Sequence, residues 1–200
     1  MTGIELAAEI RSSHHGFPAH PPGLSGNLRP TRRVRLKTTH EISVGTEVSE
    51  GSYRYLLTRR WSCESLLAFV MVNPNTADAT TDDPTIRRCV GFARREGAGG
   101  IAVLNLYALR SLRPVGLLDH PDPEGPHNQQ SWGKTLNDDH VGAVVAAWGA
   151  SAPRGLPASH ALDTHRSQEW LCLGRTANGS PRHPLYARAD TPLVSWSAAD

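Results

Sequence analysis

Polar residues follow the apolar segments of this chain at points where their side chains could take part in chemistry. Asn73 directly follows one apolar run, and Asn105 lies inside another, where its amide must find hydrogen-bond partners or lose the free energy of its hydration. A carboxamide offers a donor and an acceptor side by side, which matches the edge of a nucleobase. Asn105 is therefore a candidate base-binding residue, and a structural asparagine satisfied by its neighbours is the alternative.

A histidine near the end of the chain is the second candidate. His183 stands between Pro181 and Pro184 and beside Arg182. A histidine in such a loop could act as an acid or contact a phosphate, because its pKa lies near neutrality. A surface histidine in a turn is the alternative.

The apolar pattern predicts the elements that would position these residues. Residues 53–61 alternate bulky and polar side chains, and residues 65–72 are continuously apolar, so both predict strands. Asp83 and Pro84 are typical of a helix start, and apolar residues then recur with helical spacing until Gly97. Further strands are predicted at 101–106, 141–148, 170–173 and 192–196, a helix at 127–139, and a loop-rich segment at 114–126.

Helices that alternate with short apolar strands predict an α/β domain with three layers, α/β/α, around a mainly parallel central sheet. In such sheets ligands bind beyond the carboxyl ends of the strands, where Asn73 and Asn105 would lie. We expect this single domain to span residues 53–200. Residues 1–52 are rich in proline and lack a sustained apolar period, which predicts a flexible tail.

Composition excludes several classes of protein. The longest apolar run is far shorter than the roughly 20 residues that span a membrane, so no membrane association is expected. A net charge of +2 excludes a strongly basic DNA-coating protein and permits a local basic groove. The three cysteines are widely separated and lack neighbouring ligands, so we expect neither a zinc site nor a disulfide framework. With no signal-peptide pattern at the start, the sequence predicts a cytoplasmic protein, which we take to be a monomer.

Six separated blocks of the sequence resemble a known family in their order. They read YRY at 53–55, NPNTAD at 73–78, DDPTIRRC at 82–89, NL at 105–106, AWGA at 147–150 and PRHPLY at 181–186. This series resembles the bacterial and phage family named domain of unknown function 1643, over roughly residues 52–196. The resemblance implies a domain and no particular activity.

The order of the strand-end motifs is also similar to that of the uracil-DNA glycosylase superfamily. These proteins have an α/β/α fold, flip a base out of DNA and hydrolyse its N-glycosidic bond. Residues 71–75 resemble the loop whose asparagine positions the attacking water, which implies that role for Asn73. An amide cannot deprotonate water, so a carboxylate such as Asp78 would assist, unless Asp78 only caps a turn. Residues 103–105 resemble the strand whose terminal asparagine reads the base, which implies that role for Asn105.

The last block resembles the superfamily loop that enters the minor groove, which implies DNA-backbone contacts for Ser180 and Arg182. The histidine of that motif, which stabilises the departing base, corresponds here to Asn178, and Gly179 stands where proline is expected. Asn178 could still donate a hydrogen bond to a base oxygen, although it would stabilise developing charge less well. His183 could compensate for this loss.

The expected function is recognition of a nucleobase, in DNA or in a nucleotide, with N-glycosidic hydrolysis in DNA repair as its catalytic form. This reaction is expected to use no metal and no organic cofactor. Flipping a base costs on the order of a few kcal/mol, so a modified, mismatched or single-stranded base is the easier substrate. Tyr107, which follows Asn105 closely, is the expected stacking aromatic. A binding module without catalysis is the alternative, favoured by Asn75, Asn178 and Gly179 at altered motif positions. A small-molecule enzyme unrelated to nucleic acid is a third hypothesis.

Overall fold

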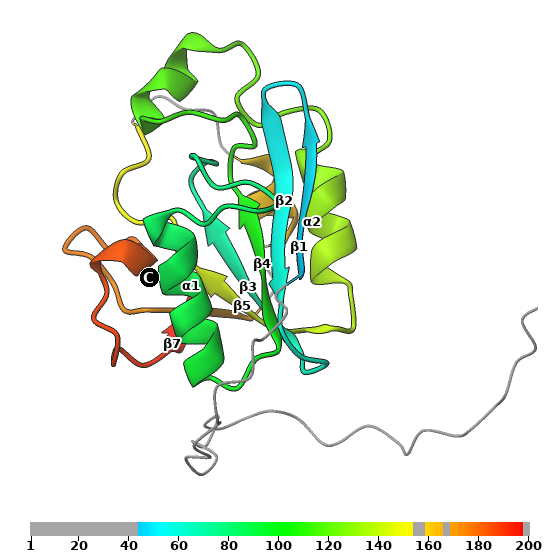
Figure 1. The fold of residues 1–200 in the computed structure, drawn as a ribbon. Helices are drawn as coiled ribbons and strands as arrows, with labels where there is room; N and C mark the ends of the chain where they lie inside the picture. Colours follow the sequence, from blue (N-terminus) through cyan, green and yellow to red (C-terminus); the bar gives the residue numbers. More distant parts are fainter. Residues whose placement is uncertain (1–43, 154–158, 166–168, 198–200) are drawn as a thin grey trace, which may run out of the picture. The chain divides into compact units, whose positions relative to one another are not determined.

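The computed structural model describes residues 44–153, 159–165 and 169–197, which form an α/β unit built on one sheet of seven strands (Figure 1). The strand order is β1-β2-β4-β3-β5-β6-β7. The strands are β1 (Val44–Glu50), β2 (Tyr53–Arg60), β3 (Leu66–Met71), β4 (Gly100–Asn105), β5 (Val141–Ala146), β6 (Trp170–Cys172) and β7 (Val194–Trp196). The helices are α1 (Pro84–Arg95), α2 (Asn128–Leu136) and α3 (His160–Thr164), with short 3₁₀ helices η1 (Pro114–Asp119) and η2 (Pro184–Tyr186).

The sheet is mixed, so the prediction of a mainly parallel sheet is wrong. Strand β3 pairs in parallel with β4 and β5, and β5 pairs in parallel with β6. The pairings β1–β2, β2–β4 and β6–β7 are antiparallel. Strands β1 and β2 are joined by a two-residue turn, which can connect only antiparallel neighbours, because parallel neighbours need a long crossover.

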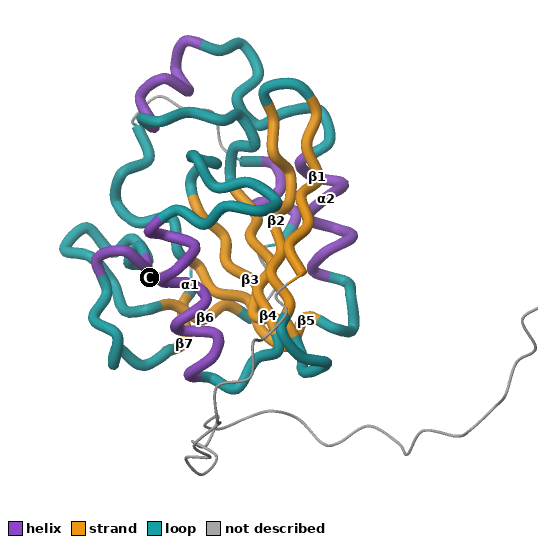
Figure 2. The backbone as a smooth tube through the Cα atoms, viewed as in Figure 1, coloured by secondary structure: helices purple, strands orange, loops and turns teal. Residues whose placement is uncertain are grey.

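The central strands are buried on both faces, as their continuous apolar runs predicted. In β3, Leu67 and Phe69 face the cluster that includes Ile86 of α1, whereas Ala68 faces the cluster that includes Trp132 of α2. Helices α1 and α2 therefore lie against opposite faces of the sheet (Figure 2). Among the described helices, none is both long and apolar enough to cross a membrane.

The amino-terminal boundary differs from the prediction. Residues 44–50, which were expected to belong to a flexible tail, form β1 and pair with β2. Bulky and polar residues do not alternate clearly in this segment, so only the pairing with β2 makes it a strand. The rest of the predicted tail, residues 1–43, lies outside the described residues.

The parallel strands bring three polar segments to one edge of the sheet. Asn73 follows β3, Asn105 ends β4, and Trp148 follows β5. Because β2 runs antiparallel to β4, the start of β2 reaches the same edge, where the backbone N–H of Arg54 donates to the carbonyl of Ala108 at 2.9 Å.

Candidate functional site

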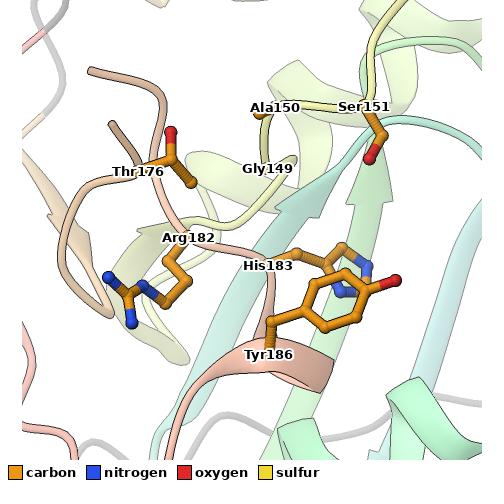
Figure 3. A pocket seen from close by; sticks show the side chains of 7 residues that line it. All are labelled: Gly149, Ala150, Ser151, Thr176, Arg182, His183 and Tyr186. Atoms are coloured by element: carbon orange, nitrogen blue, oxygen red, sulfur yellow. The ribbon is translucent and has the colours of Figure 1, made fainter. Parts of the chain in front are cut away.

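A cavity of about 230 Å³ lies beyond the carboxyl ends of β3 and β4, beside the first turn of α1. Asn73, Asn105 and His183 all line it, although they come from three distant parts of the chain. An adjoining cavity of about 320 Å³ shares Ser151, His183 and Tyr186 with it (Figure 3). The structure thus brings together three of the residues that the sequence singled out.

Asn105 is the most unusual residue of the cavity. It is 1% exposed, and neither Oδ1 nor Nδ2 has a hydrogen-bond partner among the described residues. Its carbonyl accepts hydrogen bonds from Trp132 Nε1 at 3.0 Å and from Asn128 Nδ2 at 3.1 Å, which fix the backbone at this point. A buried amide without partners costs about 1–3 kcal/mol, a cost that a ligand with a matching donor and acceptor would remove. The alternative of an asparagine satisfied by its described neighbours does not hold.

Asn73 presents its amide oxygen in a fixed orientation. Its Nδ2 donates to the carbonyls of Pro74 at 2.9 Å and Ser111 at 2.8 Å, which uses both amide hydrogens. No described group donates to Oδ1, so this oxygen is available to accept a hydrogen bond. The local sequence places it there because the Asn73-Pro74 pair begins the polar loop that follows β3.

Arg54 was not predicted to be a site residue, yet it lines the same cavity. It is 2% exposed; Nη1 donates to the carbonyl of Ala77, and Nε has no partner among the described residues. Burial and the neighbouring positive charge of Arg110 lower the pKa of Arg54 to about 10, so the guanidinium remains charged at neutral pH. No described carboxylate forms an ion pair with it.

His183 is half-buried at the start of η2 and lines both cavities. Its Nδ1 accepts a hydrogen bond from the backbone N–H of Leu185 at 3.3 Å, so a neutral ring carries its proton on Nε2. Burial lowers the pKa of His183 below 6.5, against the opposing effect of Asp83. At neutral pH the residue is therefore an uncharged Nε2–H donor.

Tyr186 and Trp148 line the cavities, whereas Tyr107 does not. Tyr186 is 73% exposed, lines both cavities, and its ring centre lies 5.8 Å from that of His183 (Figure 3). Tyr107 is buried in the core cluster on the α2 face and lines neither cavity. The structure therefore places Tyr107 outside the candidate site.

Asp78 does not reach the cavity. Its carboxylate closes a turn by accepting hydrogen bonds from the backbone N–H groups of Thr80 at 2.8 Å and Thr81 at 2.7 Å. These hydrogen bonds lower the pKa of Asp78 to about 2. The carboxylate is therefore a weak base, and it also lies outside the cavity. Asp83 is the carboxylate that lines the cavity, where its Oδ1 caps α1 by accepting from the N–H of Ile86 at 2.8 Å.

Asn178 lies outside both cavities. Its Oδ1 accepts hydrogen bonds from Thr176 Oγ1 at 2.5 Å and from the N–H of Ser180 at 3.3 Å, so it stabilises its own turn. Gly179 has a φ of +82°, which proline cannot adopt. The loop therefore differs in backbone conformation from the superfamily motif that its sequence resembles.

Of the two residues expected at a DNA backbone, only Arg182 reaches a cavity. It lines the larger one, where Nη2 donates to the carbonyl of Arg175 at 3.1 Å, and its guanidinium points away from His183 (Figure 3). Ser180 lines neither cavity, and its carbonyl accepts from the N–H of Thr176 at 2.8 Å. In the part of the chain that the structure describes, no cluster of three or more histidine, cysteine or acidic residues could hold a metal ion.

Comparison with known proteins identifies one family. A family model described as protein of unknown function (DUF1643) matches residues 54–185, which include all residues that line the 230 Å³ cavity except Tyr186. No curated protein and no solved structure matches the chain. The family resemblance of the six sequence blocks is confirmed, whereas no comparison supports the likeness to uracil-DNA glycosylases.

Proposed function

We propose that this chain, which belongs to the family described as protein of unknown function (DUF1643), binds a nucleobase in the 230 Å³ cavity and hydrolyses the N-glycosidic bond between base and sugar. One observation carries the proposal: the amide of Asn105 is buried, has no described partner and lines this cavity. A nucleobase edge offers the complementary acceptor and donor.

The rest of the lining suits a flat heterocycle. Apolar side chains of Met71, Ile86 and Trp148 line the cavity together with polar groups, as is typical of small-molecule sites. Tyr186 provides an exposed ring at the edge of the cavity, on which a planar base can stack. The two adjoining cavities together fall within the range of roughly 300–1,000 Å³ usual for such ligands.

The proposed reaction uses three side chains and water. Asn73 Oδ1 accepts a hydrogen bond from the water and orients it, and the carboxylate of Asp83 takes the water proton. The water oxygen bonds to the anomeric carbon while the carbon–nitrogen bond breaks and its electron pair stays on the base. His183 Nε2–H donates a hydrogen bond to the departing base and stabilises its charge.

The finer architecture belongs to the same proposal. A uracil-DNA-glycosylase-like three-layer fold is supported by helices on both faces of the sheet and by a cavity at the carboxyl ends of parallel strands. DNA and free nucleotides are both candidate ligands, with DNA repair the role that a DNA substrate would imply. A cytoplasmic location also remains a prediction.

A binding module without catalysis is the second candidate. It is favoured by the positions of Asp78 and Asn178, which the sequence nominated for catalysis and which line neither cavity. Such a module would keep the Asn105 amide and bind the base without releasing it.

Base release distinguishes the two candidates. The purified chain would be incubated with nucleosides, nucleotides and oligonucleotides that carry uracil or other altered bases, and free base would be measured by chromatography. We expect release, and we expect Asn73→Ala to slow it roughly 100-fold or more because the water loses its orientation. Asn137→Ala, an exposed position after α2, is the matched control and leaves the rate unchanged.

Two results would contradict parts of the proposal. Tight binding with no release from any substrate would identify a binding module. Undiminished release by Asn73→Ala would remove this residue from the mechanism while leaving Asn105 as the base-binding residue.

A further inference from the structure

Three arginines donate hydrogen bonds to carbonyls of the loop after β3, and one of them differs from the other two. Arg59 pairs with Asp82 at 2.8 Å and donates to the carbonyls of Thr58, Asp78 and Thr81, and Arg110 pairs with Glu47. Arg54 is more deeply buried than either but donates only to the carbonyl of Ala77 and has an unpartnered Nε. No described carboxylate forms an ion pair with Arg54, and the attraction of the more distant Glu47 and Asp83 is opposed by the positive charges of Arg110 and Arg59.

A buried guanidinium without an ion-pair partner is costly, because it has lost its hydration and gains no compensating hydrogen-bonded charge in return. Of the three arginines, only Arg54 lines the 230 Å³ cavity. An anionic group that entered this cavity would supply the missing partner and could accept hydrogen bonds from the guanidinium fork.

From this charge imbalance we infer that Arg54 binds the terminal phosphate of a free nucleoside 5′-monophosphate whose base contacts Asn105. The inference rests on the proposed function and narrows its ligand class from nucleobases in general to free nucleotides. Arg54 and Asn105 are held by neighbouring antiparallel strands, and both line one cavity, so a single small ligand can reach both.

Burial of Arg54 favours a terminal phosphate over one inside a polynucleotide. The residue is 2% exposed, so a phosphate must enter the cavity to reach it. An internal phosphodiester is tied to a nucleotide on each side, and both would have to follow it inward. A monoester has one attachment and also carries more negative charge.

The negative charge of Asp83 at the cavity is compatible with phosphate binding by Arg54. Asp83 lines the cavity too, but its carboxylate caps α1 and accepts the N–H of Ile86, so part of its charge is offset by the helix N-terminus. Asp83 and Arg54 form no ion pair with each other. The phosphate would therefore lie at the β2 side of the cavity and the sugar nearer to α1.

Calorimetric titration of the full chain tests the inference. The probes are adenosine, guanosine, cytidine and uridine, their 5′-monophosphates, ribose 5-phosphate, and a single-stranded oligonucleotide. We expect the best monophosphate to bind roughly 10- to 100-fold more tightly than its nucleoside, as charge-assisted hydrogen bonds allow. Arg54→Lys and Arg54→Gln should remove most of that difference.

Arg59→Lys is the matched control. It alters a buried arginine on the same strand whose partners are all protein groups, so it should lower stability without changing the ratio of monophosphate to nucleoside affinity. Circular dichroism would establish that each variant is folded. If the Arg54 variants do not fold, the comparison of nucleosides with monophosphates on the unaltered chain still tests whether the cavity binds the phosphate.

Four results have distinct meanings. Equal affinity for nucleosides and monophosphates would overturn the inference, as would an Arg54 variant that keeps the difference. Equally tight, Arg54-dependent binding of the oligonucleotide would overturn the assignment to free nucleotides. Binding of ribose 5-phosphate and all monophosphates without any base preference would support Arg54 as the phosphate residue while refuting nucleobase recognition by Asn105.

Discussion

Asn105 and Asn128 are both buried and lie in contact, yet their side chains have opposite roles. Asn128 Nδ2 donates to the carbonyls of Asn105 and Leu106, each at 3.1 Å, and so joins α2 to the end of β4. Asn128 Oδ1 has no described partner, but in Asn105 both side-chain polar atoms lack one. One asparagine therefore stabilises the fold, and the other reduces its stability in the absence of a ligand.

Asn105→Leu should make the protein more stable and abolish ligand binding. The substitution replaces an unsatisfied buried amide with an apolar group of similar shape, so we expect the free energy of unfolding to rise by about 1 kcal/mol. Asn128→Leu should lower it by about 2 kcal/mol, because two carbonyls lose a donor. Urea denaturation measures both changes. Equal destabilisation by the two substitutions would mean that the Asn105 amide has a structural role.

At the scale of elements, the segment after β5 packs closely against the loop that carries His183. Gly149 has a φ of +70°, and its N–H donates to the carbonyl of Pro181 at 2.9 Å. A Cβ at this position would lie 3.0 Å from the Cβ of His183. The close approach of the two segments depends on glycine for both backbone conformation and space.

Gly149→Ala should weaken ligand binding as well as stability. We expect the free energy of unfolding to fall by about 1–2 kcal/mol from the strained φ, and His183 to move because its Cβ must give way. Gly174→Ala is the control, since Gly174 has a φ of +82° and nothing within 4 Å of its would-be Cβ. Both variants should lose stability in thermal denaturation, Gly149→Ala the more because of its contact with His183, and only Gly149→Ala should lose affinity. Unchanged affinity in Gly149→Ala would show that the position of His183 is not critical.

Local patterns predicted most elements correctly. Helix α1 begins with Asp83 as its cap and Pro84 in its first turn, as expected, and the apolar runs at 65–72 and 101–106 contain β3 and β4. Strand β1 was missed, and the prediction of a mainly parallel sheet was wrong because β1–β2, β2–β4 and β6–β7 pair antiparallel. A strand's neighbour is decided by contacts with residues far along the chain, which no local pattern records.

At the scale of the whole molecule, the cavity joins segments that lie far apart in sequence. Arg54 comes from β2, Asn105 from β4 and His183 from the start of η2. A ligand that contacts all three can bind only when the sheet and its connections are folded together. Its binding energy therefore adds to the stability of the fold as a whole.

A bound nucleotide should raise the melting temperature of the protein. At a ligand concentration of 100 times Kd, the free energy of unfolding should rise by about 2.7 kcal/mol, which corresponds to roughly 5–10 °C for a domain of this size. Differential scanning calorimetry with the tightest nucleotide of the titration panel measures the shift. Asn105→Leu should show none, and a full shift in that variant would place the ligand elsewhere.

The sequence by itself determined the α/β class, the main helices and strands, the family, and two of the amides that line the cavity. These depend on spacing between near neighbours, on cap and turn residues, and on polar groups inside apolar runs.

The tertiary structure decided which candidates share one cavity. The folded chain places Arg54, Asp83 and Tyr186 at the 230 Å³ cavity. Neither cavity is lined by Asp78, Tyr107 or Asn178. The physical reason is that an arginine or an asparagine can be satisfied by a nearby carbonyl or left without a partner, and only the packed chain determines which.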